Sequence, residues 1–141
     1  MSSLYLLDTN ALSEAPKKVP NKGFIEWLSG VNELSIMTSC IVIGEINKGI
    51  HTIDDAEKKK TFQDWLQEVQ DSFAGRIVEI DISVCLLWGE LMAKGRIAGK
   101  TPPAINALIA AQCIINNVTL VTRNIKDFEQ FIELKVISPW K

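Results

Sequence analysis

Residues 102–124 read PPAINALIAAQCIINNVTLVTRN, and this stretch decides the fold class. Two prolines open it, and proline suits the first turn of a helix, where the backbone N–H groups have no partner in any case. The residues that follow them, AINALIAAQCII, are apolar nearly all round and predict a helix that is buried on every side. A short apolar run at 118–122 then predicts a buried strand. A buried helix leading into a buried strand is typical of α/β proteins with a parallel sheet.

The same alternation extends from this stretch toward both ends of the chain. Strands are expected at 4–7, 34–37, 76–80, 118–122 and 135–137, and helices at 9–15, 22–29, 39–50, 55–73, 83–98 and after Pro103. This order predicts a single domain, residues 1–141, with a central parallel sheet of four to five strands covered by helices on both faces. In such sheets, reactive side chains gather beyond the carboxyl ends of the strands.

Composition narrows the class of protein. Apolar residues make up 47% of the 141 and charged residues 23%, which is typical of a globular chain. The net charge of −2 argues against a general nucleic-acid coat but allows a nuclease that has an acidic metal site and a local basic rim. No apolar run reaches the roughly 18 residues of a membrane helix, and the first residues lack the basic region of a signal peptide. We therefore expect no membrane association and a cytoplasmic location.

Cysteine and histidine are too sparse for a zinc or disulfide framework. Cys40, Cys85 and Cys113 are odd in number, widely spaced and set in apolar runs, so we interpret them as reduced thiols of the core. His51 is the one histidine. The chain thus has little imidazole for acid–base catalysis near pH 7, and a metal-bound water is the alternative source of a nucleophile.

Acidic side chains follow two of the predicted strands and interrupt one of the apolar helices. Asp8 comes directly after the first strand, and Asp127 follows the fourth strand, with Asn124 closer to the strand end. Glu45 lies within the apolar helix 39–50. Each has a simpler interpretation: Asp8 as a helix N-cap, Glu45 as a solvated side chain and Asp127 as part of a polar loop.

Asn106 is a polar residue in the first turn of the buried helix after Pro103, a position that indicates a site at the helix N-terminus. Together with Asp8, Glu45, Asp127 and Asn124 it offers oxygen ligands from separate segments, which suit Mg²⁺ or Mn²⁺. A phosphodiester substrate fits such a site, because bound metal activates water and neutralises the charge of the transition state. Nearby basic side chains are candidates for RNA contact, although a solvated loop is the simpler interpretation for the last stretch: Arg123, Lys126 and the 94–100 stretch that includes Arg96.

Three stretches taken together resemble the motif blocks of PIN-domain nucleases: LLDTNALSE (6–14), IVIGEINKGI (41–50) and the stretch from Pro102 to Phe131. The resemblance is to the VapC-like toxins of type II toxin–antitoxin pairs, including the FitB-like branch, and covers essentially the whole chain. It implies a PIN-like α/β/α sandwich and RNA cleavage with Mg²⁺ or Mn²⁺. It also implies a homodimer and a cognate VapB-like antitoxin.

The resemblance also assigns roles to residues. It places Asp8 and Glu45 among the metal-associated acids, and it matches Asp127 to the late acid, with Asn124 as an alternative or additional ligand. Asn106 stands where the family normally has its third acid. An amide there removes one negative charge at nearly constant shape, so metal affinity and activity are expected to fall. Two explanations remain open, a deliberate inactivating substitution and a natural loss of activity.

Two other enzyme or signalling functions fit the sequence less well. A dehalogenase-type phosphatase needs a second aspartate where Asn10 stands, and a receiver-type signalling domain would leave Glu45 without a role. A catalytically silent PIN-fold module, which acts by binding a protein or RNA, remains the alternative. The apolar stripe from Phe62 to Phe73 and the helix with Trp88 are candidates for a dimer face, for an antitoxin groove or for core. Transfer RNA and ribosomal RNA loops are both reasonable substrates.

Overall fold

Five parallel strands form the centre of the molecule in the computed structural model, which describes residues 3–141. The strand order is β3-β2-β1-β4-β5, so β1 lies in the middle with a parallel neighbour on each side. The strands are short: β1 Tyr5–Leu7, β2 Ile36–Ser39, β3 Ile77–Val78, β4 Thr119–Val121 and β5 Val136–Ile137. The predicted parallel sheet of four to five strands is confirmed.

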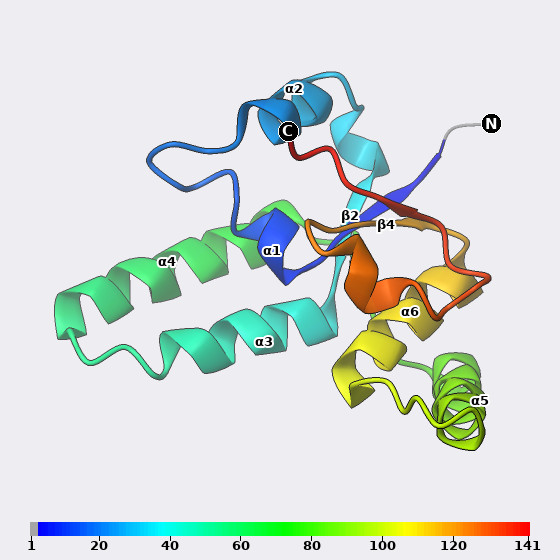
Figure 1. Ribbon diagram of the computed structural model, residues 1–141. Coiled ribbons are helices and arrows are strands. Elements are labelled where there is room, and N and C mark those ends of the chain that lie inside the picture. The colour runs from blue at the N-terminus through cyan, green and yellow to red at the C-terminus, as the bar shows by residue number, and fades with distance from the viewer. Residues whose placement is uncertain (1–2) are drawn as a thin grey trace.

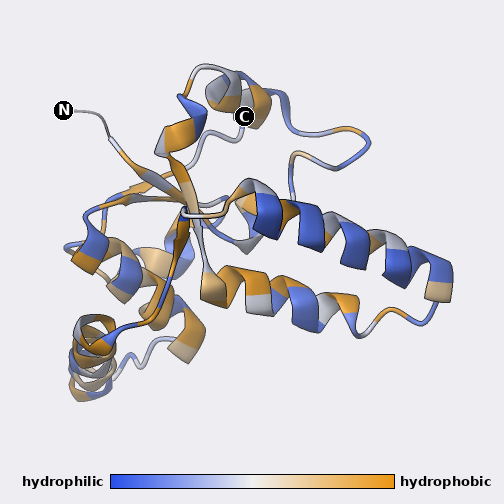
Figure 2. Ribbon diagram, turned by 180° about the vertical axis from the view of Figure 1, so that it is seen from behind, coloured by the Kyte–Doolittle hydropathy of each residue, from blue (hydrophilic) through white to orange (hydrophobic). Residues whose placement is uncertain are grey.

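Helices lie on both sides of this sheet (Figure 1). Their bounds are α1 Thr9–Leu12, α2 Lys22–Ser29, α3 Cys40–Ile50, α4 Ala56–Ser72, α5 Ile82–Ile97 and α6 Ala104–Asn116, with 3-10 turns η1 Glu33–Ser35 and η2 Ile125–Phe128. α3 and α4 form a hairpin that projects from one side of the body, and α5 packs against α6 on the other side (Figures 1 and 2). The predicted α/β/α arrangement is therefore confirmed.

The core is centred on β1, β4 and α6. Leu6 and Leu120 have no exposed surface, and α6 buries side chains on most of its circumference. The buried helix that the run AINALIAAQCII predicts is confirmed for its middle part, whereas Ile105 and Ile115 near its two ends are exposed. α4 is mostly hydrophilic in Figure 2 and buries only Leu66 and Val69, as its amphipathic pattern predicts.

Several boundaries and one burial prediction differ from the sequence-based expectation. The second strand begins at Ile36, because the Asn32 side chain caps the 3-10 turn before it and leaves Leu34 74% exposed. The first helix ends at Leu12 rather than at residue 15. Cys85 is an exposed free thiol and not part of the core, so that prediction was wrong; Cys113 is buried and Cys40 is half-buried. Within residues 3–141, no helix is long and apolar enough to span a membrane.

Candidate metal centre

Asp8 lies at the carboxyl end of the central strand, between β2 and β4. Its backbone N–H donates to the carbonyl of Val121 at 3.2 Å, which ties it to the end of β4. Its Oδ1 accepts the backbone N–H of Ala11 at 2.9 Å, so Asp8 is the N-cap of α1. The simpler interpretation from sequence is thus correct, and it does not exclude a second role, because the N-cap bond engages only one carboxylate oxygen.

The Asp8 carboxylate is nearly inaccessible, with 6% of the residue exposed. Burial raises its pKa above the ordinary value of 3.8, and hydrogen bonds from the Thr122 hydroxyl and the Ala11 and Asn10 N–H groups, with the charge of Arg123, partly offset that rise. Among residues 3–141, no lysine or arginine forms an ion pair with Asp8. A buried carboxylate of this kind favours a bound cation.

Glu45 lies on the helix that starts at the same edge of the sheet. α3 begins directly after Ser39, which ends β2 and caps the helix through the N–H of Ile41. α3 packs against α1, whose first turn Asp8 caps. The Glu45 side chain is 31% exposed and has only a long contact of 3.7 Å with Lys48, so it stays available to a further partner.

Asn106 is the third residue of α6 and is half-buried. It shares a helix face with Ala110 and Cys113, because residues four and seven positions apart lie on one side of a helix. Burial raises the pKa of the Cys113 thiol, and the nearby charge of Asp8 raises it further. The charge of Asp8 thus acts on the Cys113 end of this face, and among residues 3–141 no hydrogen bond joins Asn106 itself to Asp8. Since α6 precedes β4, its N-terminus lies at the carboxyl edge of the parallel sheet.

The segment after β4 brings Thr122 and Arg123 to Asp8, as described above. Asn124 follows, and its N–H bonds the Thr122 hydroxyl oxygen at 3.1 Å. Asp127 lies on η2 and is exposed. An open depression of about 560 Å³ in this region is lined by Arg123, Asn124, Ile125, Lys126, Asp127 and Ser138. Within the described chain, Asp127 forms no ion pair or side-chain hydrogen bond with the residues around Asp8, so its role as a ligand stays a prediction.

Arg96 does not share that depression. It is exposed near the end of α5 and lines a separate one with Met92, Ala93, Ile97 and Thr101. The structure therefore brings Arg123 and Lys126 together and leaves Arg96 apart from them. A contact between Arg96 and RNA stays a prediction.

The donor set fits a hard cation that keeps part of its hydration. Among residues 3–141, no group of three histidine, cysteine, aspartate or glutamate side chains lies close enough together to hold a metal ion. Mg²⁺, however, is often bound through one or two carboxylates and several waters. Asp8 and Glu45 can supply these carboxylates, and Asn106 or Asn124 can add an amide oxygen.

The sequence analysis did not identify two buried polar residues near this edge of the sheet. Thr122 is fully buried beside Asp8, but a threonine that ends a strand carries no distinctive signal. Gln112 is also fully buried: its Oε1 accepts the Ser39 hydroxyl at 2.6 Å, and its Nε2 donates to the carbonyls of Val78 and Glu79. A glutamine in the middle of the apolar stretch ALIAAQCII is the signal that could have identified it.

An apolar groove of about 380 Å³ lies on the other side of α1. Ala11, whose N–H holds Asp8, contributes its side chain to this groove. Further lining comes from α1, α2 and the α4 stripe, including Leu12, Ala15, Phe24, Leu28, Trp65, Val69 and Phe73. The stripe predicted as core, dimer face or groove thus forms a groove wall in part, and Phe62 is 37% exposed.

Comparisons with known proteins agree with this geometry. The sequence profile of the PIN domain matches residues 5–133. The chain is 34% identical to "Ribonuclease VapC2" of Rickettsia felis, over 97% of this chain and 98% of that protein, and 28% identical to "Toxin FitB" of Neisseria gonorrhoeae, over 97% and 99%. Among solved structures, FitAcB from Neisseria gonorrhoeae superposes with a TM-score of 0.87 at 28% identity, covering 97% of this chain and 99% of that one.

Proposed function

The chain belongs to the PIN-domain family, and we propose that it is a metal-dependent endoribonuclease toxin of the VapC and FitB type, neutralised by a cognate VapB-like antitoxin. The observation that carries this proposal is Asp8, a carboxylate buried at the carboxyl end of the central strand that forms no ion pair within residues 3–141. Such a group is costly to keep charged unless a cation joins it. The names of the relatives, one a ribonuclease and one a toxin, support the same function.

In the proposed mechanism, the Asp8 and Glu45 carboxylates hold Mg²⁺ or Mn²⁺, with Asn106 and Asn124 as neutral oxygen ligands and Asp127 as a further acid. A bound metal of this type supplies an activated water and neutralises the charge that develops on the phosphodiester. Arg123 and Lys126, on the rim of the open depression, hold the RNA backbone by charge. The N-terminal turn of α6 presents unpaired N–H groups, which favour a phosphate nearby.

Asn106 weakens this site in the present sequence. It lies on the face of α6 that also carries Cys113, on which the charge of Asp8 acts, and an aspartate there would add a further full negative charge to those of Asp8 and Glu45. We infer that the chain retains metal-dependent cleavage at a reduced rate. The substrate is an exposed RNA loop, such as those of transfer or ribosomal RNA, in the cytoplasm.

The apolar groove beside α1 suits the antitoxin. Its walls accept the apolar face of an amphipathic helix, which is a common mode of recognition between a small regulator and its target. A basic side chain carried by that partner can then reach Asp8 and Glu45 and compete with the metal. A homodimer is the further assembly that we propose, with the apolar side chains of α5, Ile82, Leu86 and Ile97, available on its surface.

A cleavage assay tests the function directly. A fluorescent structured RNA is incubated with the purified chain in Mg²⁺ or Mn²⁺, with EDTA and Asp8→Asn as controls. Metal-dependent fragments that both controls abolish support the proposal. RNA that binds the protein but stays intact under all metals, also with Asn106→Asp, contradicts it.

A second candidate, a catalytically silent module that binds RNA or a partner protein, is favoured by one observation. The described residues hold no cluster of three acids, histidines or cysteines that could bind a metal ion. The resemblance to PIN-domain nucleases implies an acid where Asn106 stands. The Asn106→Asp variant separates the two functions, because restored cleavage assigns an enzyme with one weakened ligand.

A further inference from the structure

Glu14 is a second buried acid, and the proposed metal centre does not use it. Its side chain is 4% exposed. Hydrogen bonds from three directions satisfy the carboxylate: Oε2 accepts the backbone N–H of Asn21 at 2.9 Å, and Oε1 accepts Lys17 Nζ at 3.0 Å and Trp140 Nε1 at 3.1 Å. These bonds, with that of Asn21 as the largest effect, lower the pKa of Glu14 despite its burial.

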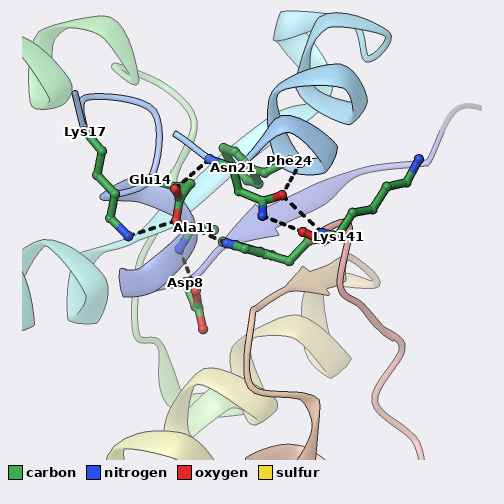
Figure 3. A network of polar contacts seen from close by, with 8 residues as sticks. Asp8, Ala11, Glu14, Lys17, Asn21, Phe24 and Lys141 are labelled. Carbon is green, nitrogen blue, oxygen red and sulfur yellow. Dashed lines mark hydrogen bonds and ion pairs between the residues drawn. The ribbon is translucent and has the colours of Figure 1, made fainter. Parts of the chain in front are cut away.

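Residues 139–141 are seated on the segment that Glu14 organises (Figure 3). Asn21 Nδ2 donates to the carbonyl of Lys141 at 2.8 Å, and Asn21 Oδ1 accepts the Lys141 N–H at 3.1 Å. The Trp140 ring packs on Phe24 with centroids 4.8 Å apart. Gly23 permits this approach, because a Cβ there would lie 2.5 Å from the Pro139 carbonyl oxygen.

Glu14, Asn21 and Trp140 form a cluster that lies next to α1, the turn whose first residues hold Asp8. α1 is only four residues long, and a single helical turn has little stability of its own. Its beginning is fixed by the bond from the Ala11 N–H to Asp8, and Glu14 follows two residues after its end. In Figure 3, the second carboxylate oxygen of Asp8 points away from Glu14, so the two acids occupy opposite ends of α1.

We propose that Glu14 and Trp140 are positioning residues for Asp8. By tying the end of α1 to Asn21 and to residues 139–141, they hold the Ala11 N–H, and with it the Asp8 carboxylate, in the orientation that receives a cation. The part of this claim that concerns cation binding rests on the proposed function. The part that concerns the geometry of α1 does not.

The test uses Trp140→Phe in the Asn106→Asp background. This change removes the bond to Glu14 Oε1 and keeps an aromatic ring against Phe24. Trp88→Phe is the matched control, because Trp88 Nε1 also donates one hydrogen bond, which joins α5 to the Ala104 carbonyl of α6 and does not involve α1. Glu14→Gln is the second variant: an amide cannot accept from all three donors.

Two readouts are compared, hydrogen exchange of the Ala11 amide by NMR without metal and the Kd for Mn²⁺. We expect Trp140→Phe to speed the exchange of the Ala11 amide about tenfold and to weaken Mn²⁺ binding about fivefold. The effect on Mn²⁺ is smaller than that of removing a side chain that hydrogen-bonds a metal ligand directly, because Trp140 acts on Asp8 only through α1. Glu14→Gln exceeds both effects, and Trp88→Phe, whose bond lies at the start of α6, leaves the exchange of Ala11 unchanged.

The outcomes separate the two claims. If Ala11 exchange in Trp140→Phe matches that in Trp88→Phe while both melt at similar temperatures, the cluster is only structural and the proposal is overturned. The same holds if Mn²⁺ affinity is unchanged. If the Asn106→Asp chain without further changes binds no Mn²⁺ and cleaves no RNA, the proposed function fails. Ala11 exchange alone then decides whether Glu14 and Trp140 position α1.

Discussion

The backbone N–H of Ala11 donates to Asp8 Oδ1 at 2.9 Å, so the acid at the carboxyl end of β1 is at once a helix cap and the centre of the candidate site. The same residue, Ala11, lines the apolar groove with its side chain. One helical turn therefore connects the apolar groove with the candidate metal centre.

Without metal, the charge of Asp8 should cost stability. Its pKa is raised in the folded protein, so the folded state binds a proton more tightly, and the free energy of unfolding falls as the pH rises above 3.8 and through the raised pKa. Asp8→Asn keeps an N-cap oxygen and removes this slope, so the variant should be more stable than the parent chain at pH 7. Urea unfolding in EDTA from pH 4 to 8 measures it. Asp64→Asn, at an exposed position, is the control; a slope that persists in Asp8→Asn contradicts the assignment.

Asn106→Asp should increase Mg²⁺-dependent RNA cleavage by at least about tenfold, since the added carboxylate strengthens the attraction of the site for the cation. Initial rates over a Mg²⁺ titration measure the change. Asn116→Asp, at the other end of α6, is the matched control for added charge. Equal rates in the parent and in Asn106→Asp would remove this residue from the mechanism.

Ala15→Glu should weaken binding of the cognate antitoxin by at least about tenfold, because a carboxylate would have to lose water inside an apolar groove. Ala15 is exposed and lines the groove, so the change leaves the core intact. Ala56→Glu, at the exposed start of α4, controls for charge. Surface plasmon resonance with captured antitoxin gives the affinities, and unchanged binding in Ala15→Glu would place the partner elsewhere.

Gln112→Leu should lower the free energy of unfolding by about 2–4 kcal/mol, because it leaves the Ser39 hydroxyl and the Val78 and Glu79 carbonyls without their buried partner. Chemical denaturation gives the value. Gln67→Leu removes a comparable but exposed bond, to Asp71, and should have little effect. A loss below 1 kcal/mol would mean that these strand ends hold together without the cross-link.

Local patterns in the sequence predict most of the fold. The apolar run after Pro103 predicts α6, and the alternation of short apolar runs with amphipathic stretches predicts the parallel sheet. Such patterns identify an apolar face but not what covers it. Ile82, Leu86 and Ile97 on α5 remain largely exposed, and Cys85 lies on the same open helix.

The site is predictable in part for a related reason. The carboxyl ends of parallel strands share one edge, so an acid after β1 and a polar segment after β4 are expected to meet. Asp8 is hydrogen-bonded by the Thr122 side chain, and the charge of Arg123 also acts on it. The contacts of Glu14 are different. Its bond to Trp140 joins residues 126 positions apart, and no local pattern specifies such a pairing.

The most direct test of the account is a Mn²⁺ titration of four proteins without RNA: the parent chain, Asp8→Asn, Glu45→Gln and Asn106→Asp. If Asp8 and Glu45 share one metal site, Asp8→Asn and Glu45→Gln should each weaken Mn²⁺ binding at least about tenfold. Asn106→Asp should strengthen it. Affinity for Mn²⁺ that is the same in all four proteins would contradict the shared metal centre.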